Sequence, residues 1–257
     1  MALTAETAIV RTIKKRSPPA SLTEWRALRL AANRSEGMEC TYQEMRRHQG
    51  VLEAVEAALV AEQGGLCAYT GQRIAIVPPD SATGDPLSDF HIEHLTPQAH
   101  CAYGQDADYS NIVACWPRPN CGFEPAYGAR KKGSWPSTAE QSLFVSPLRA
   151  DCSERFAFNR RGEIKPAKAG DTAAEETIRR LGLEDHTLTA LRRAAIQGYL
   201  GFRPISLAQA RRLANHLLSE SDMVNRGALV RLTPYCFAIE QALEQEIRKL
   251  EAIARER

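Results

Sequence analysis

The stretch from residue 91 to residue 135 constrains this chain more than any other part of the sequence. It reads HIEHLTPQAHCAYGQDADYSNIVACWPRPNCGFEPAYGARKKGSW and carries three His, three Cys, an acid next to a His, and an Asn. Thiolate, imidazole and carboxylate groups are the side chains with which proteins bind metal ions. We therefore expect the fold to bring several of these side chains together.

The pattern of this stretch predicts a strand, a loop, a second strand and a helix. Residues 90–97 read as a short strand that ends at Pro97, and residues 98–110 read as a polar loop. Residues 111–115 (NIVAC) read as a second short strand or the start of a turn. The basic cluster within residues 127–135 is expected on a helix.

Helical patterns precede this stretch. Residues 21–33 and residues 41–63 show apolar side chains at helical spacing. Each begins with a capping box, Ser21 with Glu24 and Thr41 with Glu44, and Gly64-Gly65 ends the second helix. The arm formed by residues 1–20 carries Arg11, Lys14, Lys15 and Arg16 and ends at Pro18-Pro19, which excludes a helix there. It is expected to contact phosphates or a partner protein, or to be a solvated charged segment.

The other segments alternate between β and helical patterns. Residues 66–77 read as a turn followed by a strand, and residues 78–89 read as a loop rich in Pro, Gly, Ser and Asp. Residues 143–165 read as two strands joined by a turn. From Asp171 onward the chain reads as helices, the first of them ended by Gly182.

These patterns predict an α+β fold in three segments. Residues 1–65 form an N-terminal arm and helices, residues 66–167 form a central core with a following β segment, and residues 168–257 form a helical C-terminal region. The 257 residues are 44% hydrophobic and 25% charged, which suits a globular protein with a substantial core.

Composition also limits the partners and the location. The net charge is +2, so a nucleic-acid partner would have to be bound by a local basic patch. No apolar run is long enough to span a bilayer, and the first residues lack the apolar segment of a signal peptide. We therefore expect no membrane partner and a cytoplasmic location.

Seven cysteines are present, and an odd number without a secretion signal does not suggest a disulfide framework. Cys67, Cys115 and Cys121 stand beside turn residues, where thiolates typically hold a structural Zn²⁺. Thr70 stands where a zinc knuckle would place its second Cys. His91 or Cys101 would complete the set, and the alternative is that the thiols pack as small apolar groups without zinc.

The adjacent pair Glu93-His94 has the chemistry that phosphodiester hydrolysis requires. A neutral His deprotonates the attacking water, and an acid beside it holds a hard metal ion that stabilises the developing charge. Asn111 would then fix the loop by hydrogen bonds or touch the metal. Alone, each of these residues is more simply a half-buried strand residue or an ordinary turn Asn.

Arg130, Lys131 and Lys132 form the basic cluster at the end of the stretch. They are expected to contact phosphates of a nucleic acid without reading its sequence. The alternative is a solvated charged face.

The order of these motifs resembles an HNH (ββα-metal) endonuclease. The longer pattern resembles the PtuB family of HNH nucleases from Septu and retron-linked anti-phage systems. The resemblance covers about residues 10–165 and rests on IKKRSPPASLTEWR, CAYTGQRI, HIEHLTPQ, DYSNIVAC, YGARKKGSW and SPLRADCSERFAFNRRGEI.

The resemblance implies that His94 is the general base, that Glu93 lies at a catalytic Mg²⁺ or Mn²⁺, and that Asn111 is the middle residue of the HNH triad. The last metal ligand would be a residue near the final helix, and Asn120, Glu124 and Ser134 are the candidates. The family also implies a PtuA-like ATPase of the ABC/SMC type as partner, docked on the N-terminal arm and the C-terminal helices. This chain itself has no Walker A pattern.

The expected function is thus metal-dependent cleavage of DNA or RNA as the effector of an anti-phage defence complex. One alternative is a non-catalytic module with structural zinc that binds nucleic acid or acts as a scaffold. A third is a metal-dependent hydrolase of small phosphoesters, although an open site beside a basic helix suits a long polyanion better.

Overall fold

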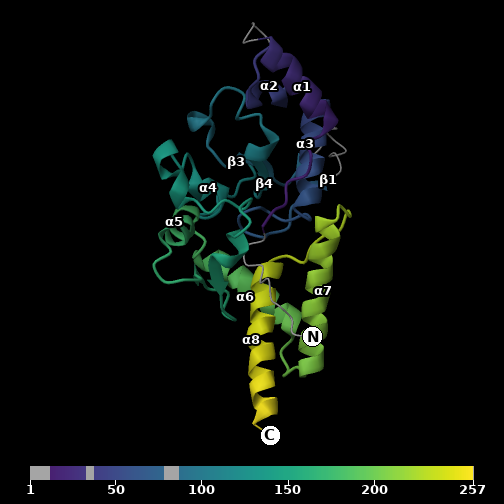
Figure 1. The fold of residues 1–257 in the computed structure, drawn as a ribbon, viewed down its shortest axis with the longest axis vertical. Helices are drawn as coiled ribbons and strands as arrows, with labels where there is room; N and C mark the ends of the chain where they lie inside the picture. The colour runs from purple at the N-terminus through teal and green to yellow at the C-terminus, as the bar shows by residue number, and fades with distance from the viewer. Residues whose placement is uncertain (1–11, 33–37, 78–86, 257) are drawn as a thin grey trace.

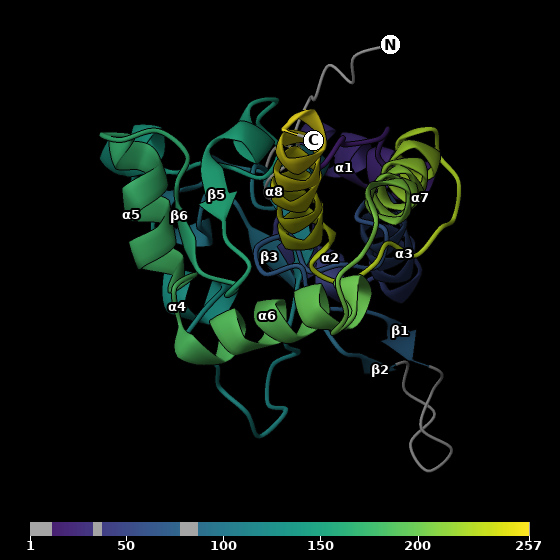
Figure 2. The ribbon, with the colours of Figure 1, turned by 90° about the horizontal axis from the view of Figure 1, so that it is seen from below.

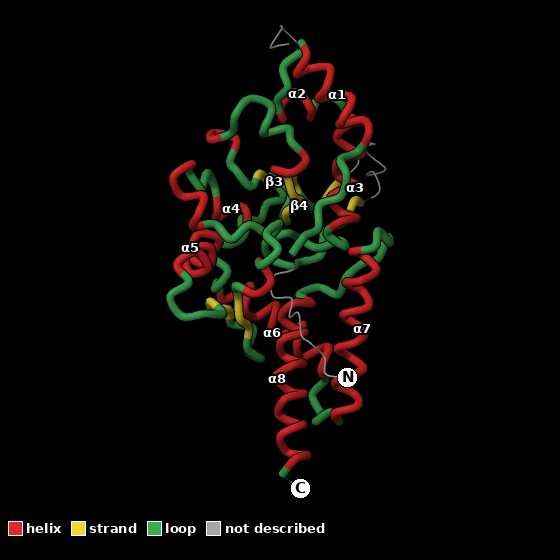
Figure 3. Tube along the Cα trace, viewed as in Figure 1, coloured by secondary structure: helices red, strands yellow, loops and turns green. Residues whose placement is uncertain are grey.

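The computed structural model describes residues 12–32, 38–77 and 87–256. Its fold is mixed α+β and mostly helical, with a few short antiparallel strands (Figure 3). The molecule is elongated, with the N-terminal helices at one end and the C-terminal helix at the other (Figure 1). The strands of the sequence-predicted metal-binding stretch lie between these two ends.

Three helices form the N-terminal part. They are α1 (Ala20–Ala31), α2 (Tyr42–Arg46) and α3 (Gln49–Glu62). The buried faces of α1 and α3 contribute Leu22, Trp25, Val55 and Leu59 to the core. Gly64 and Gly65 both have positive φ and turn the chain out of α3, as predicted.

The strands form three separate antiparallel pairs. β1 (Ile76–Val77) pairs with β2 (Leu87–Ser88), β3 (His91–His94) pairs with β4 (Ile112–Cys115), and β5 (Phe156–Phe158) pairs with β6 (Ile164–Pro166). The short helix α4 (Ala129–Lys132) follows β4, so the predicted order of strand, loop, strand and helix is confirmed. Short 3₁₀ segments lie at Gln98–His100, Tyr109–Asn111, Thr138–Leu143 and Cys152–Glu154.

Four more helices follow within residues 172–255, where the sequence predicts helices. They are α5 (Thr172–Leu181), α6 (His186–Leu200), α7 (Leu207–Asn225) and α8 (Cys236–Arg255). Seen from below, α6 crosses one side of α8, and α7 runs beside α8 (Figure 2). The first turns of α8 are buried, whereas its second half projects from the molecule (Figure 1).

Two predicted helices differ from the structure, one in its start and one in its continuity. The helix α1 begins at Ala20 after Pro19, so Ser21 lies inside the helix and no side chain caps it. The single helix predicted for residues 41–63 is two helices. Thr41 does cap α2 by accepting a hydrogen bond from the Glu44 N–H. The break comes at His48, whose ring nitrogen bonds the guanidinium of Arg29 at 2.8 Å, a contact with α1 that local sequence does not reveal.

The described part of the N-terminal arm packs on its own chain. Ile13 is buried, the Lys15 ammonium pairs with Glu62, and the Arg16 guanidinium donates to the Val224 carbonyl at the end of α7. This corrects the expectation that these two basic residues face phosphates or a partner protein. The expectation for Arg11 and the first part of the loop predicted for residues 78–89, residues 78–86, lie outside the described residues. The loop prediction is wrong at Leu87–Ser88, which form strand β2 because they pair with β1. Within the described part of the chain, no helix has the length and apolar character that crossing a membrane requires.

Candidate active site

The pairing of β3 with β4 decides which candidate side chains share a face. His91 lies opposite Cys115, Glu93 opposite Val113, and His94 opposite Ile112. Successive side chains of a strand point to opposite faces, so His91 and Glu93 share one face and His94 points to the other. Burial follows this alternation, because Ile92 and His94 are each only 6% exposed. The neighbours Glu93 and His94 therefore act in different surroundings.

Glu93 is held by a lysine from α4. The Lys132 ammonium donates to Glu93 Oε1 and to the His94 carbonyl, both at 2.8 Å. The His91 Nε2 atom lies 3.7 Å from Glu93 Oε2. Burial raises the pKa of Glu93, but its contacts with His91 and Lys132 outweigh burial and lower the pKa overall. The carboxylate is therefore charged and already balanced by positive charge.

His94 is fixed as a neutral base. Its Nε2 lies 2.9 Å from the Asp106 carbonyl oxygen, which only accepts, so the proton sits on Nε2. The neutral ring then carries its basic lone pair on Nδ1. The Tyr42 ring packs edge-on against it with 4.6 Å between centroids. Burial lowers the pKa of His94, so the ring is neutral at pH 7.

Asn111 fixes the loop that follows His94. Its Oδ1 accepts from the Thr96 N–H at 2.8 Å, and its Nδ2 donates to the Thr96 carbonyl at 3.1 Å. The backbone carbonyl of Asn111 also accepts from the Leu95 N–H. Of the roles expected for Asn111, the hydrogen-bonding one matches these contacts, because the amide oxygen and nitrogen are both engaged with the loop.

His91 has the opposite electrostatic behaviour to His94. Its Nδ1 donates to the Pro117 carbonyl at 2.6 Å, which leaves Nε2 directed toward Glu93. Burial lowers the pKa of His91, but Glu93 and the Pro117 carbonyl outweigh burial and raise it. His91 is therefore a partner for Glu93 and is not held neutral as His94 is.

Two of the three expected zinc-binding thiols lie together. Cys67 hydrogen-bonds to Cys115 and to Thr70, and these bonds overcome the effect of burial and hold the pKa of Cys67 at about 6. Burial raises the pKa of Cys115. The Tyr69 hydroxyl is buried near the same thiols and lacks a hydrogen-bond partner among the described residues.

The remaining expected zinc thiol, Cys121, and the alternative ligand Cys101 lie in two other loops. Cys121 donates to the Phe123 carbonyl in the loop before α4. Cys101 donates to the Thr96 carbonyl and accepts from Asn111, so it is part of the loop after His94. Of the alternatives for a fourth zinc ligand, His91 is the one that lies opposite Cys115.

A ready-made metal site is not present in this geometry. Among residues 12–32, 38–77 and 87–256, no three His, Cys, Asp or Glu side chains are grouped closely enough to hold a metal ion. Glu93 offers one carboxylate, and the Lys132 ammonium already occupies the space beside Oε1. While the Lys132 ammonium is in place, Glu93 therefore does not fit a hard divalent cation.

The predicted basic cluster divides into two parts. Arg130 and Lys131 are exposed on α4, whereas the Lys132 side chain is fully enclosed. This corrects the expectation that all three side chains face a nucleic acid. The three candidates for the last metal ligand, Asn120, Glu124 and Ser134, are exposed.

The contact of Lys132 with Glu93 was missed by sequence reasoning. In the sequence, a Lys that follows Arg130 and Lys131 looks the same whether its side chain is buried or exposed to solvent.

A cleft of about 540 Å³ adjoins the loop after His94. It lies between α1, this loop and the segment after α4, and its lining includes Arg26, Thr96, Gln105, Asn111, Gln141 and Phe144. Arg26 is paired with Asp108 at 2.8 Å, which neutralises the cation on this wall. The Arg26–Asp108 pair therefore adds no net charge to the wall of the cleft.

No family model matches the chain, and no curated protein matches it either. We therefore infer a function for this chain from its own residues and their geometry.

Proposed function

We propose that this protein is an endonuclease of the HNH type that hydrolyses phosphodiester bonds in nucleic acid, with His94 as its general base. The observation that carries the proposal is the state of His94. The ring is neutral, its Nε2–H is fixed to the Asp106 carbonyl, and the loop that follows is fixed by Asn111. A base held in one tautomer by a backbone carbonyl is what proton abstraction requires.

In the proposed reaction, His94 Nδ1 takes a proton from water as the water oxygen attacks phosphorus. The bond from phosphorus to the leaving sugar oxygen breaks, and that oxygen takes up a proton from a second water molecule as it departs. The Asp106 carbonyl stabilises the positive ring that forms, because it accepts the N–H on the opposite side. The Lys132 ammonium, which pairs with Glu93, also donates to the His94 backbone carbonyl.

Exposed positive charge on α4 supports a polyanionic substrate. Arg130 and Lys131 lie on the surface of α4, the helix that also holds Lys132 against Glu93. Arg130 is only loosely paired, with its NH1 at 3.9 Å from the exposed Glu124. These two side chains would contact phosphates that flank the reacting one.

The metal ions expected from the sequence stay predictions. Mg²⁺ or Mn²⁺ is the expected catalytic ion, and Zn²⁺ is the expected structural ion at Cys67 and Cys115. The chemistry of two adjacent thiols beside His91 suits zinc, although a full ligand set is not grouped in the described residues. Elemental analysis of the purified protein decides whether zinc is present.

A role in phage defence with a PtuA-like ATPase is part of the same proposal. The projecting second half of α8 offers charged side chains for such a partner. The first turns of α8 are unsuitable for a deletion test because they are part of the core. The Gln241 amide there bonds the Phe158 backbone, so removing this helix would damage the fold as well as any docking surface.

The direct test is cleavage of DNA and RNA by the full chain, alone and with the ATPase, in the presence of Mg²⁺ or Mn²⁺. We expect His94→Ala to reduce the cleavage rate by roughly 10²–10⁴-fold, the usual loss when a general base is removed. His100→Ala is the matched control, because His100 is exposed on the neighbouring loop, and it should leave the rate unchanged.

Undiminished cleavage by a folded His94→Ala variant would show that His94 is not the base. The wild-type chain itself distinguishes the nuclease from the alternative of a non-catalytic zinc module. That alternative predicts bound zinc, nucleic-acid binding and no cleavage by the wild-type chain with or without the ATPase.

A further inference from the structure

Lys132 occupies a position that is unusual for a lysine from a basic cluster. Its side chain is fully enclosed, whereas Arg130 and Lys131 just before it are exposed. Its Nζ donates to two oxygens, Glu93 Oε1 and the His94 carbonyl, each at 2.8 Å. A buried ammonium with no partner would be strongly destabilising, so these contacts fix where the charge lies.

The two oxygens around Lys132 are of the kind that can also bind a divalent cation when no ammonium lies between them. Hard cations such as Mg²⁺ and Mn²⁺ bind carboxylate and backbone carbonyl oxygens. An ammonium is a compact point charge that donates to the same oxygens. One position cannot hold both, because two cations a few ångströms apart repel each other strongly in a buried site.

The backbone fixes the start of α4, the helix that carries Lys132. The Gly128 N–H, at the start of α4, donates to the Leu181 carbonyl at the end of α5 at 2.7 Å. Gly128 has φ +72°, and a Cβ there would lie 3.1 Å from the Thr70 methyl group, so the turn fits closely against the segment of Cys67. The position of the ammonium is therefore set by packing and is not that of a mobile surface side chain.

We infer that the Lys132 ammonium is the resident cation of the Glu93 site and competes there with divalent metal ions. A divalent ion reaches Glu93 Oε1 and the His94 carbonyl only by displacing this ammonium. The consequence for catalysis rests on the proposed nuclease function. The competition itself is a binding property and is measured without any nucleic acid.

The test is Mn²⁺ binding by the full-length protein, measured by electron paramagnetic resonance and calorimetry. The variants are Lys132→Met, which removes the charge, and Lys132→Gln, which removes the charge but keeps N–H donors for both oxygens. We expect each to bind Mn²⁺ roughly ten- to a thousandfold more tightly than the wild type, the effect of one nearby charge on a charged site. Adding Glu93→Gln to either variant should abolish the gain.

Two controls separate competition from a general change of charge. Lys132→Arg keeps the positive charge and should bind Mn²⁺ as weakly as the wild type. Lys131→Met removes an exposed charge from the same helix and should also leave the affinity unchanged. Circular dichroism and thermal unfolding check that each variant is folded, and Lys132→Gln serves if Lys132→Met does not fold.

Two outcomes would overturn the inference. One is a wild-type protein that binds Mn²⁺ through Glu93 as tightly as the uncharged variants do. The other is a folded Lys132→Met or Lys132→Gln variant that gains no Glu93-dependent affinity. Neither outcome depends on cleavage. If the wild type cleaves no nucleic acid, the nuclease proposal fails, but the measured competition between Lys132 and Mn²⁺ still holds.

Discussion

His91 and His94 stand on the same short strand, yet their surroundings give them opposite properties. The first donates to the Pro117 carbonyl and faces Glu93, and these contacts raise its pKa. The second is buried against Tyr42 and donates to the Asp106 carbonyl, and burial lowers its pKa. His94 is therefore better suited than His91 to accept a proton at neutral pH.

This difference predicts the pH dependence of cleavage. A general base works in its neutral form, so the rate falls as the pH drops through the pKa of the base. If His94 is the base, the acid limb of kcat/KM is centred below about 6.5, the ordinary value for His. If His91 is the base, the limb is centred above that value. Initial rates between about pH 4.5 and 8.5, at constant ionic strength and cation concentration, distinguish the two, and a limb above 6.5 would exclude His94.

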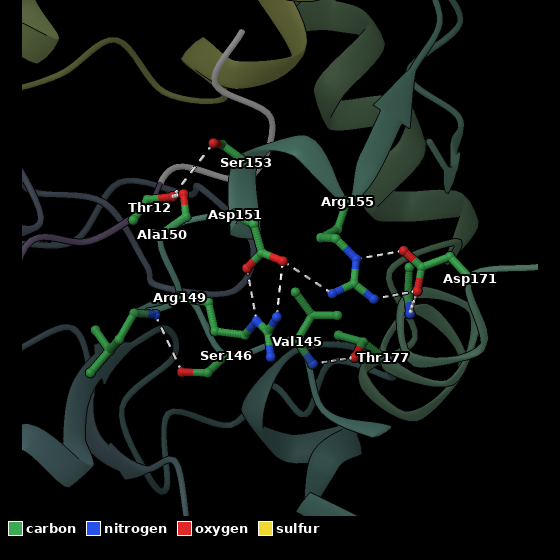
Figure 4. A network of polar contacts seen from close by, with 12 residues as sticks. Thr12, Val145, Ser146, Arg149, Ala150, Asp151, Ser153, Arg155, Asp171 and Thr177 are labelled. Carbon is green, nitrogen blue, oxygen red and sulfur yellow. Dashed lines mark hydrogen bonds and ion pairs between the residues drawn. The ribbon is translucent and has the colours of Figure 1, made fainter. Parts of the chain in front are cut away.

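At the scale of the element, the start of α5 is held by a chain of charged contacts (Figure 4). Asp171 caps α5 by accepting from the Ala174 N–H at 3.0 Å, and it pairs with Arg155 from the segment before β5. Arg155 also contacts Asp151, which Arg149 binds through two hydrogen bonds. The helix α5 is thereby connected to the β5–β6 pair.

We predict that the N-cap and the ion pair of Asp171 contribute separately to the free energy of unfolding. Asp171→Ala should lower the free energy of unfolding by about 1–2 kcal/mol, the usual cost of losing an N-cap. Asp171→Asn keeps a capping oxygen and loses only the ion pair, so it should cost less than about 1 kcal/mol. Urea unfolding at pH 7 measures both, with the exposed Glu184→Ala as control.

The same pair has a defined pH dependence. Arg155 holds the pKa of Asp171 below its usual range, so the stabilisation is present above the unfolded value of about 3.9 and is lost as the pH falls through the folded value. The difference between wild type and Asp171→Asn should therefore shrink on acidification. A constant difference down to about pH 2 would contradict this assignment.

Elements with a strong local pattern were predictable from the sequence, and long-range contacts were not. The order of strand, loop, strand and helix follows from the alternation and the turn residues of residues 90–135. Gly182 ends α5 as expected, because it adopts φ +59° where a left-handed residue is required. The break in the helix predicted for residues 41–63 falls at His48, which contacts Arg29 of α1, and local periodicity does not encode that contact.

The candidate site shows the same division. The bonds of Asn111 to Thr96 follow from a loop Asn placed before a strand. Of the three turn thiols expected together, Cys67 and Cys115 meet, whereas Cys121 bonds the Phe123 carbonyl in the loop before α4. The place of Lys132 was not predictable. It depends on the packing of α4 against α5 through the bond from Gly128 to Leu181, and the basic cluster itself favours exposure.

At the scale of the whole molecule, one buried carboxylate connects parts of the chain that are far apart in sequence. The Glu62 side chain is fully enclosed at the end of α3. It accepts from the Lys15 ammonium at 2.7 Å, the Arg16 N–H at 3.1 Å and the Tyr109 hydroxyl at 3.0 Å. The Lys15 ammonium also lies 3.9 Å above the Tyr109 ring. Tyr109 starts the 3₁₀ segment that ends at Asn111, so the arm, α3 and the loop of the candidate site meet at Glu62.

Removing this carboxylate should therefore destabilise the molecule and loosen the candidate site together. Glu62→Ala leaves Lys15 and the Tyr109 hydroxyl buried without their acceptor, and we expect a loss of about 3–5 kcal/mol in the free energy of unfolding. Hydrogen exchange should also rise in residues 95–111, because the Tyr109 anchor is lost. Glu53→Ala, an exposed change on the same helix, should stay within about 0.5 kcal/mol of the wild type. If Glu62→Ala matched that control in both measurements, the three segments would have to be joined mainly by their apolar contacts, such as the buried side chain of Ile13.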